Sequence, residues 1–440
     1  MDDQLRPLFE EAVKEKNMPG VGYFIVDGKG NFLSKGAFGT THLQEPDAAP
    51  FDADTTVAIF SCTKLVTTIA ALQLMEQGKL ALDDPVEKYV PRIAKIQVLE
   101  SIKPGADGKL DPVLRPAKTK PTILHLITHT VGFAYDFFDH STLAWRTYTG
   151  RPPMGYHSVG AWEDFETPFV SDPGTRYIYG IGIDWLGFVI EAVSGERLPD
   201  YLTNHVLQPL GMTATSGKIP PGNKSPAVVH FDLEGQGLIG NKDARHNESP
   251  QVWGGGGFLY STMNDYAKLL AALLNNGTSP TTGNQILKPE TVKDYVFSDQ
   301  LGPEVDRSFV GEIASSIPIA TLEGTLLPSL PVEKKGWSAG LLLNHDDLPY
   351  GRKAGSGAWA GLGNLFYWID PQTGIAGMIV SNILPFLNPT IMRLFDELER
   401  VAYGHNVAGE GGVEDDKRNY KPKKKAEEKV TNQAPLKSKV

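Results

Sequence analysis

The sequence has a single cysteine, Cys62, in 440 residues. One cysteine cannot form a disulfide within the chain, and it cannot supply the clustered thiolates of a structural zinc site. The chain also has no apolar run near the ~20 residues that span a bilayer. Its N-terminus, MDDQLRPLFEEAVKEK, is acidic and amphipathic and lacks the basic-then-apolar layout of a secretion signal. We therefore expect a cytoplasmic protein that does not enter a membrane.

An excess of positive charge is missing as well, because the formal net charge is −10. Nucleic acids and anionic membranes both bind basic surfaces, so the composition argues against both as partners. The remaining composition, 41% hydrophobic and 21% charged, is that of an ordinary globular protein. A chain of this length usually forms more than one packed region.

Strand-like segments lie near both ends of the sequence, and helical segments fill the middle. Helical periodicity predicts helices over 3–17, 61–77, 262–276 and roughly 388–403. The β-rich runs are VGYFIVDGKG and NFLSKGAFG near the start, and AGLLLN (339–344), LGNLFYWID (362–370) and GIAGMIVS (374–381) near the end. Strands joined by short links pair antiparallel. We predict an α/β (α+β) fold whose single antiparallel sheet comes from both chain ends and is flanked by the first and last helices.

This layout predicts three regions. Residues 1–84 and 236–410 would form the sheet domain, and residues 85–235 an inserted, mainly helical domain. Clefts between such regions are favoured ligand sites. Residues 411–440 have almost no apolar content and many charges, which predicts a disordered tail. The alternative for the tail is a binding patch formed by its lysine cluster.

A serine and a lysine stand three residues apart in AIFSCTKLVTTIAAL, residues 58–72. Three helical residues turn the chain by about 300°, so Ser61 and Lys64 share a face. A serine hydroxyl is a weak nucleophile until a base takes its proton, and lysine can act as that base only when neutral. Apolar neighbours such as Phe60 and Leu65 could desolvate the amine, which favours the neutral form. The pattern is that of a catalytic serine with a lysine base.

Other interpretations of this stretch exist. The spacing S-x-x-K arises by chance about once or twice in a chain of this length, so the pair could also be a helix cap with a snorkelling lysine. Cys62 is a rival nucleophile, but it lies one residue off the shared face. We expect it to be a buried structural thiol.

Five segments, in order along residues 5–405, resemble the β-lactamase-like serine hydrolases. They are IFSCTKLVTTIAALQLMEQGKLALDDPVEKYVP, LHLITHTVGF, PGTRYIYGIGIDWLGFVIEAVSG, WGGGGFLYSTMNDYAKLLAALLNNG and WAGLGNLFYWIDPQTGIAGMIVSN. This superfamily includes class C β-lactamases and penicillin-binding proteins, and the chain is most similar to the family VIII esterases and the fungal statin-type acyltransferases (transesterases). The resemblance implies a β-lactamase/transpeptidase-like fold and an acyl-enzyme on Ser61.

The resemblance places the family's catalytic tyrosine at Tyr179, because IDWLGFVIE aligns with the helix that follows that residue. Tyr177 is the alternative. The family pattern is Y-x-N, whereas this chain has Ile181 in place of the asparagine. In β-lactamases that amide helps to hold the substrate's amide side chain, and isoleucine cannot form such a hydrogen bond. The departure at this substrate-binding position favours an esterase-like member.

A second departure concerns the K-T-G motif, which in lactamases edges the active site. The candidates are Lys353-Ala354-Gly355 and Trp359-Ala360-Gly361. We prefer the second, because it abuts the strand LGNLFYWID and because the related esterases and acyltransferases often have W-x-G there. A tryptophan offers apolar surface to an acyl or polyketide-like group, in place of a cation for a carboxylate. The resemblance implies an oxyanion site between the backbone N–H of Ser61 and that of Ala360 or Gly361.

The expected enzyme is a serine esterase or acyltransferase. It would form an acyl-enzyme from an ester or thioester and pass the group to water or an alcohol, in secondary metabolism. Lys64 and Tyr179 would act as a coupled base. We expect no cofactor; the partners would be a small-molecule acyl donor, which includes an acyl-carrier or other thioester, and an alcohol acceptor. The alternatives are a β-lactamase or D-Ala-D-Ala carboxypeptidase, and a non-catalytic binding protein with the same fold.

Two further motifs are expected to be structural. His125 and His129 have the i, i+4 spacing of metal ligands, but no acidic residue completes an H-E-x-x-H pattern, so we expect no metal. The run Gly254–Gly257 could cradle an anion, but we expect a tight turn with unusual dihedral angles beside the pocket.

Overall fold

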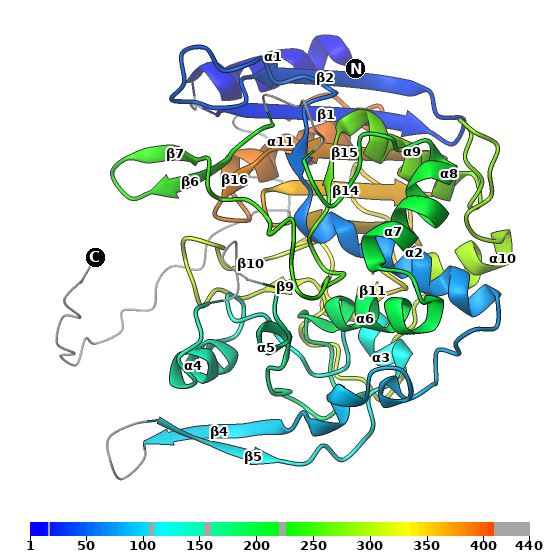
Figure 1. Ribbon diagram of the computed structural model, residues 1–440. Helices are drawn as coiled ribbons and strands as arrows, with labels where there is room; N and C mark the ends of the chain where they lie inside the picture. Colours follow the sequence, from blue (N-terminus) through cyan, green and yellow to red (C-terminus); the bar gives the residue numbers. More distant parts are fainter. Residues whose placement is uncertain (16–17, 105–109, 154–159, 220–225, 409–440) are drawn as a thin grey trace.

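A seven-stranded antiparallel sheet organises the molecule (Figure 1). The structure, a computed structural model, describes residues 1–15, 18–104, 110–153, 160–219 and 226–408. The strands in spatial order are β11 (Lys335–Trp337), β12 (Leu342–Asn344), β13 (Gly357–Gly361), β14 (Leu365–Asp370), β15 (Ile375–Val380), β1 (Gly20–Asp27) and β2 (Phe32–Gly39). Strand β1 pairs with β15, so the N-terminal hairpin joins strands from the other end of the chain. The predicted fold class is confirmed.

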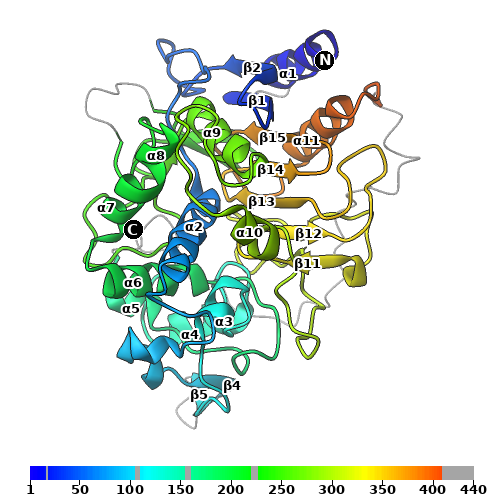
Figure 2. The same ribbon diagram turned by 90° about the vertical axis from the view of Figure 1, so that its right-hand side faces the viewer.

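Helices cover both faces of this sheet. Helices α1 (Asp2–Glu15) and α11 (Pro389–Ala402) contact each other and lie on one face, and α9 (Met263–Leu274) lies on the other (Figure 2). In α1 the buried residues Leu5, Phe9 and Ala12 recur at helical spacing and form one apolar stripe. The sheet is therefore buried on both sides.

Helix α2 (Thr63–Glu76) follows the predicted serine and runs through the interior. Every residue from Thr63 to Leu74 is buried, so the helix has no solvent-facing stripe. An apolar helix without amphipathic periodicity is typical of such a position. Helix α6 (Gly182–Ser194) packs directly against it.

The middle of the chain is not purely helical. It contains the helices α3 (Ile123–Ile127), α4 (His140–Tyr148), α5 (Trp162–Phe165), α7 (Leu198–Leu202) and α8 (Gln208–Leu210). It also forms a hairpin of β4 (Val98–Pro104) and β5 (Leu110–Arg115), which the sequence analysis did not predict. The hairpin projects from the end of the molecule opposite α1, and its charged residues obscure any two-residue alternation (Figure 1).

The division into a sheet domain and an inserted domain remains a prediction. Its second boundary, at residues 235 and 236, falls in the turn between β6 (Val229–Leu233) and β7 (Gly237–Asn241). Strand β6 also pairs with β16 (Ile383–Leu384), so this hairpin joins the last part of the fold. The predicted tail, 411–440, lies outside the described residues. Within the described ranges, no helix is long and apolar enough to cross a membrane.

Candidate active site

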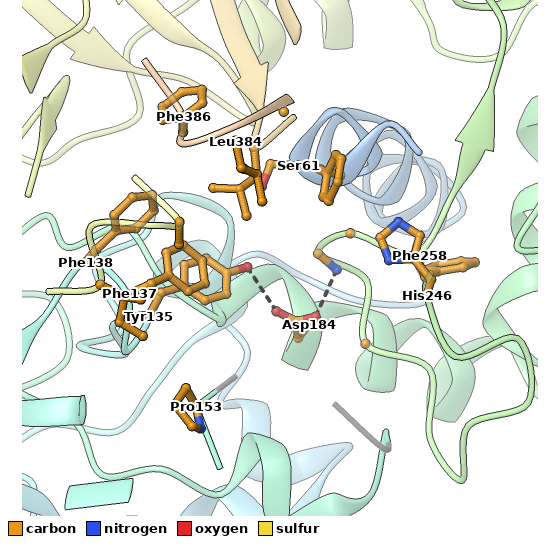
Figure 3. Close-up of a pocket in the computed structure, with 18 of the residues that line it drawn as sticks. Ser61, Tyr135, Phe137, Phe138, Pro153, Asp184, His246, Phe258, Leu384 and Phe386 are labelled. Carbon is orange, nitrogen blue, oxygen red and sulfur yellow. Dashed lines mark hydrogen bonds between the residues drawn. The ribbon is translucent and has the colours of Figure 1, made fainter. Parts of the chain in front are cut away.

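Ser61 stands in the middle of a one-turn helix, Phe60–Cys62, that leads directly into α2. The residue before it, Phe60, has a φ of +46°, in the left-handed region that a bulky side chain rarely adopts. A backbone conformation of this kind costs about 1–3 kcal/mol of folding free energy, and residues that adopt one are concentrated at functional sites. Ser61 lines a cavity of about 430 Å³ (Figure 3).

Lys64 lies beneath Ser61 with its amine buried. The side chain is 1% exposed, and Nζ lies 3.0 Å from Ser61 Oγ. Nζ also donates to Tyr135 OH at 3.0 Å and to the Gly256 carbonyl at 2.8 Å. The structure thus brings the predicted serine and lysine into direct hydrogen-bond contact.

Tyr179 contributes to the same cavity but contacts Lys64 through its ring. The centre of the ring lies 5.0 Å from Lys64 Nζ, and the Tyr179 hydroxyl accepts a hydrogen bond from Trp359 Nε1 at 3.2 Å. Tyr177 is buried against His129 and Trp337 and is not among the residues that line the cavity. Of the two tyrosines considered, Tyr179 is the one at the site.

The segment Trp359-Ala360-Gly361 on β13 lines the cavity beside Ser61. A Cβ on Gly361 would lie 2.6 Å from the Ile59 carbonyl, so the glycine lets this strand approach the serine turn closely. The other candidate segment does not line the cavity; the Lys353 side chain is 44% exposed and pairs with Asp347 at 2.9 Å. The geometry agrees with the preference for the W-A-G segment.

Ile181, a predicted substrate-binding residue, and Cys62, the rival nucleophile, are both packed in the core. Ile181, placed at the substrate-binding position, is 1% exposed at the start of α6 and does not line the cavity. Its side chain packs into the apolar core instead. Cys62 is fully buried, and burial raises the pKa of its thiol, which disfavours the reactive thiolate.

The two histidines brace the loop around α3. His125 exchanges hydrogen bonds with Thr122 at the start of that helix, each at 3.2 Å. His129 is 1% exposed and packs against Tyr179, with ring centres 4.6 Å apart. Burial, with a contribution from Lys64, holds the pKa of His129 well below its usual range. Both side chains therefore take part in the packing around α3.

The chain also contains a G-x-S-x-G sequence, GWSAG at 336–340, a pattern that carries the nucleophile in α/β-hydrolases. Here it forms the link between the antiparallel strands β11 and β12, so no helix follows the serine. Ser338 is completely buried, and its Oγ accepts a hydrogen bond from the Leu341 N–H at 3.2 Å. The motif is structural in this fold.

Tyr135 and Asp184 form part of the site, although the sequence analysis did not single them out. Asp184, on α6, is 6% exposed; its Oδ2 accepts from Tyr135 OH at 3.4 Å and its Oδ1 from the Gly256 N–H at 3.0 Å (Figure 3). Burial raises the pKa of Asp184, and burial together with the Asp184 charge raises the pKa of Tyr135. One signal was present: Asp184 is the single charged residue between Arg176 and Glu191.

The glycine run meets α6 at very short range. A Cβ on Gly254 or Gly256 would lie within 2.4 or 2.6 Å of an Asp184 oxygen, and one on Gly255 within 2.5 Å of the Ile183 carbonyl. None of the four glycines, Gly254–Gly257, has a positive φ. The expectation of unusual dihedral angles was therefore wrong, because it is close approach that requires glycine at 254, 255 and 256.

The walls of the cavity are mostly apolar and aromatic. They include Phe137, Phe138, Phe231, Trp253, Phe258 and Phe386. The described residues that line it include neither arginine nor lysine. The site therefore combines a polar floor with walls suited to an uncharged, bulky group.

Comparison with known proteins agrees with this geometry. A family model described as Beta-lactamase matches residues 5–396. The chain belongs to the beta-lactamase family. It is 30% identical over 387 residues to lovastatin esterase from Penicillium rubens, covering 86% of this chain and 92% of that protein. It is 28% identical over 412 residues to monacolin J acid methylbutanoyltransferase from Aspergillus terreus, and the match covers 91% of this chain and 95% of that protein.

A solved structure supports the same relationship. A mutant of simvastatin synthase from Aspergillus terreus superposes with a TM-score of 0.76 at 27% identity, covering 91% of this chain and 93% of that one. A penicillin-binding protein homologue from Pyrococcus abyssi shares the fold, with a TM-score of 0.64 at 22% identity. The predicted family and fold are confirmed, and the names of the relatives confirm the predicted class of enzyme, esterase or acyltransferase.

Proposed function

We propose that this protein is a serine esterase or acyltransferase that forms an acyl-enzyme on Ser61. The observation that carries the proposal is the buried Lys64 amine, 3.0 Å from Ser61 Oγ at the floor of an apolar cavity. A neutral amine at that distance can take the serine proton as the oxygen attacks a carbonyl. Ser61 lines the cavity, and its hydroxyl is in direct hydrogen-bond contact with this amine.

The reaction proceeds in two balanced halves. As Ser61 Oγ bonds to the acyl carbon, its proton moves to Lys64. The ester C–O or thioester C–S bond then breaks, and Lys64 gives a proton to the leaving alcohol or thiol. Water or an alcohol then attacks the acyl-enzyme, gives its proton to the amine, and Ser61 regains one. Tyr179, whose ring lies 5.0 Å from Lys64 Nζ, assists these proton transfers through its hydroxyl. The carbonyl oxygen accepts from the N–H of Ser61 and of Ala360 or Gly361, and each such donor typically lowers the barrier by about 3 kcal/mol.

The cavity supports an apolar acyl donor and a bulky alcohol acceptor. Its aromatic walls offer surface for a polyketide-like skeleton or a branched acyl chain. The names of two relatives, a lovastatin esterase and a monacolin J acid methylbutanoyltransferase, describe hydrolysis and transfer on compounds of that kind. We propose a role in secondary metabolism, with an ester or an acyl-carrier thioester as donor. A cytoplasmic location remains a prediction.

The residues argue against β-lactamase or carboxypeptidase activity. Ile181 replaces the asparagine of the family pattern, and Trp359 stands where lactamases have a lysine. Both changes remove groups that would bind the amide and carboxylate of a β-lactam. We expect slow turnover of nitrocefin compared with p-nitrophenyl butyrate.

Mass spectrometry after incubation with p-nitrophenyl butyrate and a panel of acyl thioesters tests the proposal. We expect an acyl adduct on Ser61, and a loss of turnover on the order of a thousandfold or more in Ser61→Ala. Ser338→Ala is the matched control and should keep the parental rate, because Ser338 is buried away from the cavity. An adduct elsewhere, or near-normal turnover in Ser61→Ala, would overturn the proposal.

A further inference from the structure

Four groups at the cavity floor form a closed ring of hydrogen bonds. Lys64 Nζ donates to the Gly256 carbonyl at 2.8 Å, and the Gly256 N–H donates to Asp184 Oδ1 at 3.0 Å. Asp184 Oδ2 accepts from Tyr135 OH at 3.4 Å (Figure 3). Tyr135 OH in turn accepts from Lys64 Nζ at 3.0 Å. Ser61 Oγ lies outside the ring, as the third partner of Nζ.

The direction of these bonds matters for a lysine base. A neutral amine has two N–H groups and one lone pair, and the lone pair must face Ser61 Oγ to take its proton. Both N–H groups must therefore point at Gly256 and Tyr135. The Gly256 carbonyl can only accept, but a tyrosine hydroxyl can either accept or donate. A hydroxyl that donated to Nζ would occupy the lone pair.

Asp184 removes this ambiguity. A carboxylate can only accept, so it takes the single proton of the Tyr135 hydroxyl and leaves the phenolic oxygen to accept from Lys64. We propose that Asp184 and Tyr135 are positioning residues that aim the lone pair of neutral Lys64 at Ser61. The proposal rests on the proposed function, because it assigns Lys64 the role of the base.

Local packing supports this assignment. Tyr135 and Gly256, which both accept hydrogen bonds from the Lys64 amine, each also donate one to Asp184. Tyr135 donates through its hydroxyl and Gly256 through its N–H. Any side chain at Gly254 or Gly256 would collide with the carboxylate, so the glycine run fits Asp184 closely. Burial keeps the pKa of Tyr135 above its usual value, so the hydroxyl retains the proton that it donates.

The variant Asp184→Asn reverses the direction of one hydrogen bond in the ring, the bond between residue 184 and Tyr135. The amide oxygen can still accept from the Gly256 N–H, but the amide nitrogen would donate to Tyr135, whose own proton would then turn toward Lys64. The readout is the rate at which a p-nitrophenyl alkylphosphonate labels Ser61, followed by mass spectrometry. We expect that rate to fall about 100-fold, with little change in the phosphonate concentration that gives half-maximal rate.

A second substitution separates positioning from structural support. Tyr135→Phe alone leaves one Lys64 N–H without its acceptor and should reduce labelling about tenfold. In Tyr135→Phe/Asp184→Asn no hydroxyl can occupy the lone pair, so labelling should recover about tenfold from the Asp184→Asn rate. If Asp184 only supported the glycine run, the double variant would label as slowly as Asp184→Asn or more slowly, and the proposal would be overturned.

Controls keep the outcomes distinct. Asp265→Asn changes another buried carboxylate, at the start of α9, and should leave the labelling rate unchanged. If the parental protein is not labelled on Ser61, the proposed function fails before any variant is compared. If Ser61 is labelled but Asp184→Asn reacts at the parental rate, only the present inference fails. Should Asp184→Asn not fold, Tyr135→Phe alone decides, because an unchanged rate in that variant also overturns the inference.

Discussion

Arg352 and Lys64 are both buried basic side chains, 2% and 1% exposed, yet their surroundings differ. Arg352 Nε and Nη2 donate to the two carboxylate oxygens of Glu399, on α11, at 3.0 and 2.6 Å. The hydrogen-bond partners described for Lys64 are two hydroxyls and a backbone carbonyl. The nearby Asp184 is linked to Lys64 by hydrogen bonds through Tyr135 and Gly256. A direct ion pair fixes a charge, whereas uncharged acceptors let an amine lose and regain a proton.

The comparison predicts that the two basic residues affect different properties. Arg352→Met should lower the free energy of unfolding by about 3 to 5 kcal/mol, because it removes the guanidinium that pairs with the buried Glu399 carboxylate. Urea unfolding measures this loss. The rate of Ser61 labelling in the folded variant should stay at the parental value. A large fall in that rate would show that Arg352 also supports the site and would weaken the contrast.

The variant Tyr179→Phe tests whether the Tyr179 hydroxyl takes part in proton transfer at the site. Tyr179→Phe should reduce kcat for p-nitrophenyl butyrate about 100-fold with little change in KM, because a proton-transfer group is lost and the aromatic wall is kept. Tyr177→Phe is the matched control and should behave like the parental enzyme, since Tyr177 lies outside the cavity. An unchanged kcat in Tyr179→Phe would move the role to Tyr135.

His230 shows a third way to bury an ionisable group, which is to keep it neutral. Its Nε2 accepts from the Leu43 N–H at 3.0 Å, and burial, with a smaller contribution from His42, lowers its pKa to about 4. The unfolded imidazole takes up a proton near a pKa of about 6.5. Stability is therefore fully present above that value and is lost as pH falls toward the folded pKa.

The measurement is urea unfolding at pH 7 and pH 5. Between these values the parental protein should lose about 2 kcal/mol more than His230→Gln, which cannot titrate. This is the smallest of the expected effects. Equal losses in the two proteins would mean that His230 is not held neutral.

The sheet and the serine–lysine pair could be predicted because their signals are local. Apolar runs joined by short links predicted antiparallel strand pairing, and the spacing of Ser61 and Lys64 predicted that both lie on one helix face. The W-A-G segment could be chosen because it precedes a strand that fits the family's final hairpin. In each case the observation and the prediction concern neighbouring residues.

The ring around Lys64 could not be predicted because its members are distant in sequence. Tyr135, Asp184 and Gly256 are brought together only when α6 and the glycine run pack against α2. A single aspartate in an apolar helix signals a buried partner, but its identity depends on tertiary packing. The same limit applies to Ile181, whose alignment position did not reveal that its side chain faces the core.

The rate of Ser61 labelling in Lys64→Met tests the central claim most directly. Methionine has a similar length and no charge, so it fills the buried site and should leave the melting temperature near or above that of the parental protein. If the amine activates Ser61, labelling by a p-nitrophenyl alkylphosphonate should fall on the order of a thousandfold while Arg352→Met reacts normally. A Lys64→Met protein that labels within about twofold of the parental rate, too small a change for the loss of a base, would contradict the account.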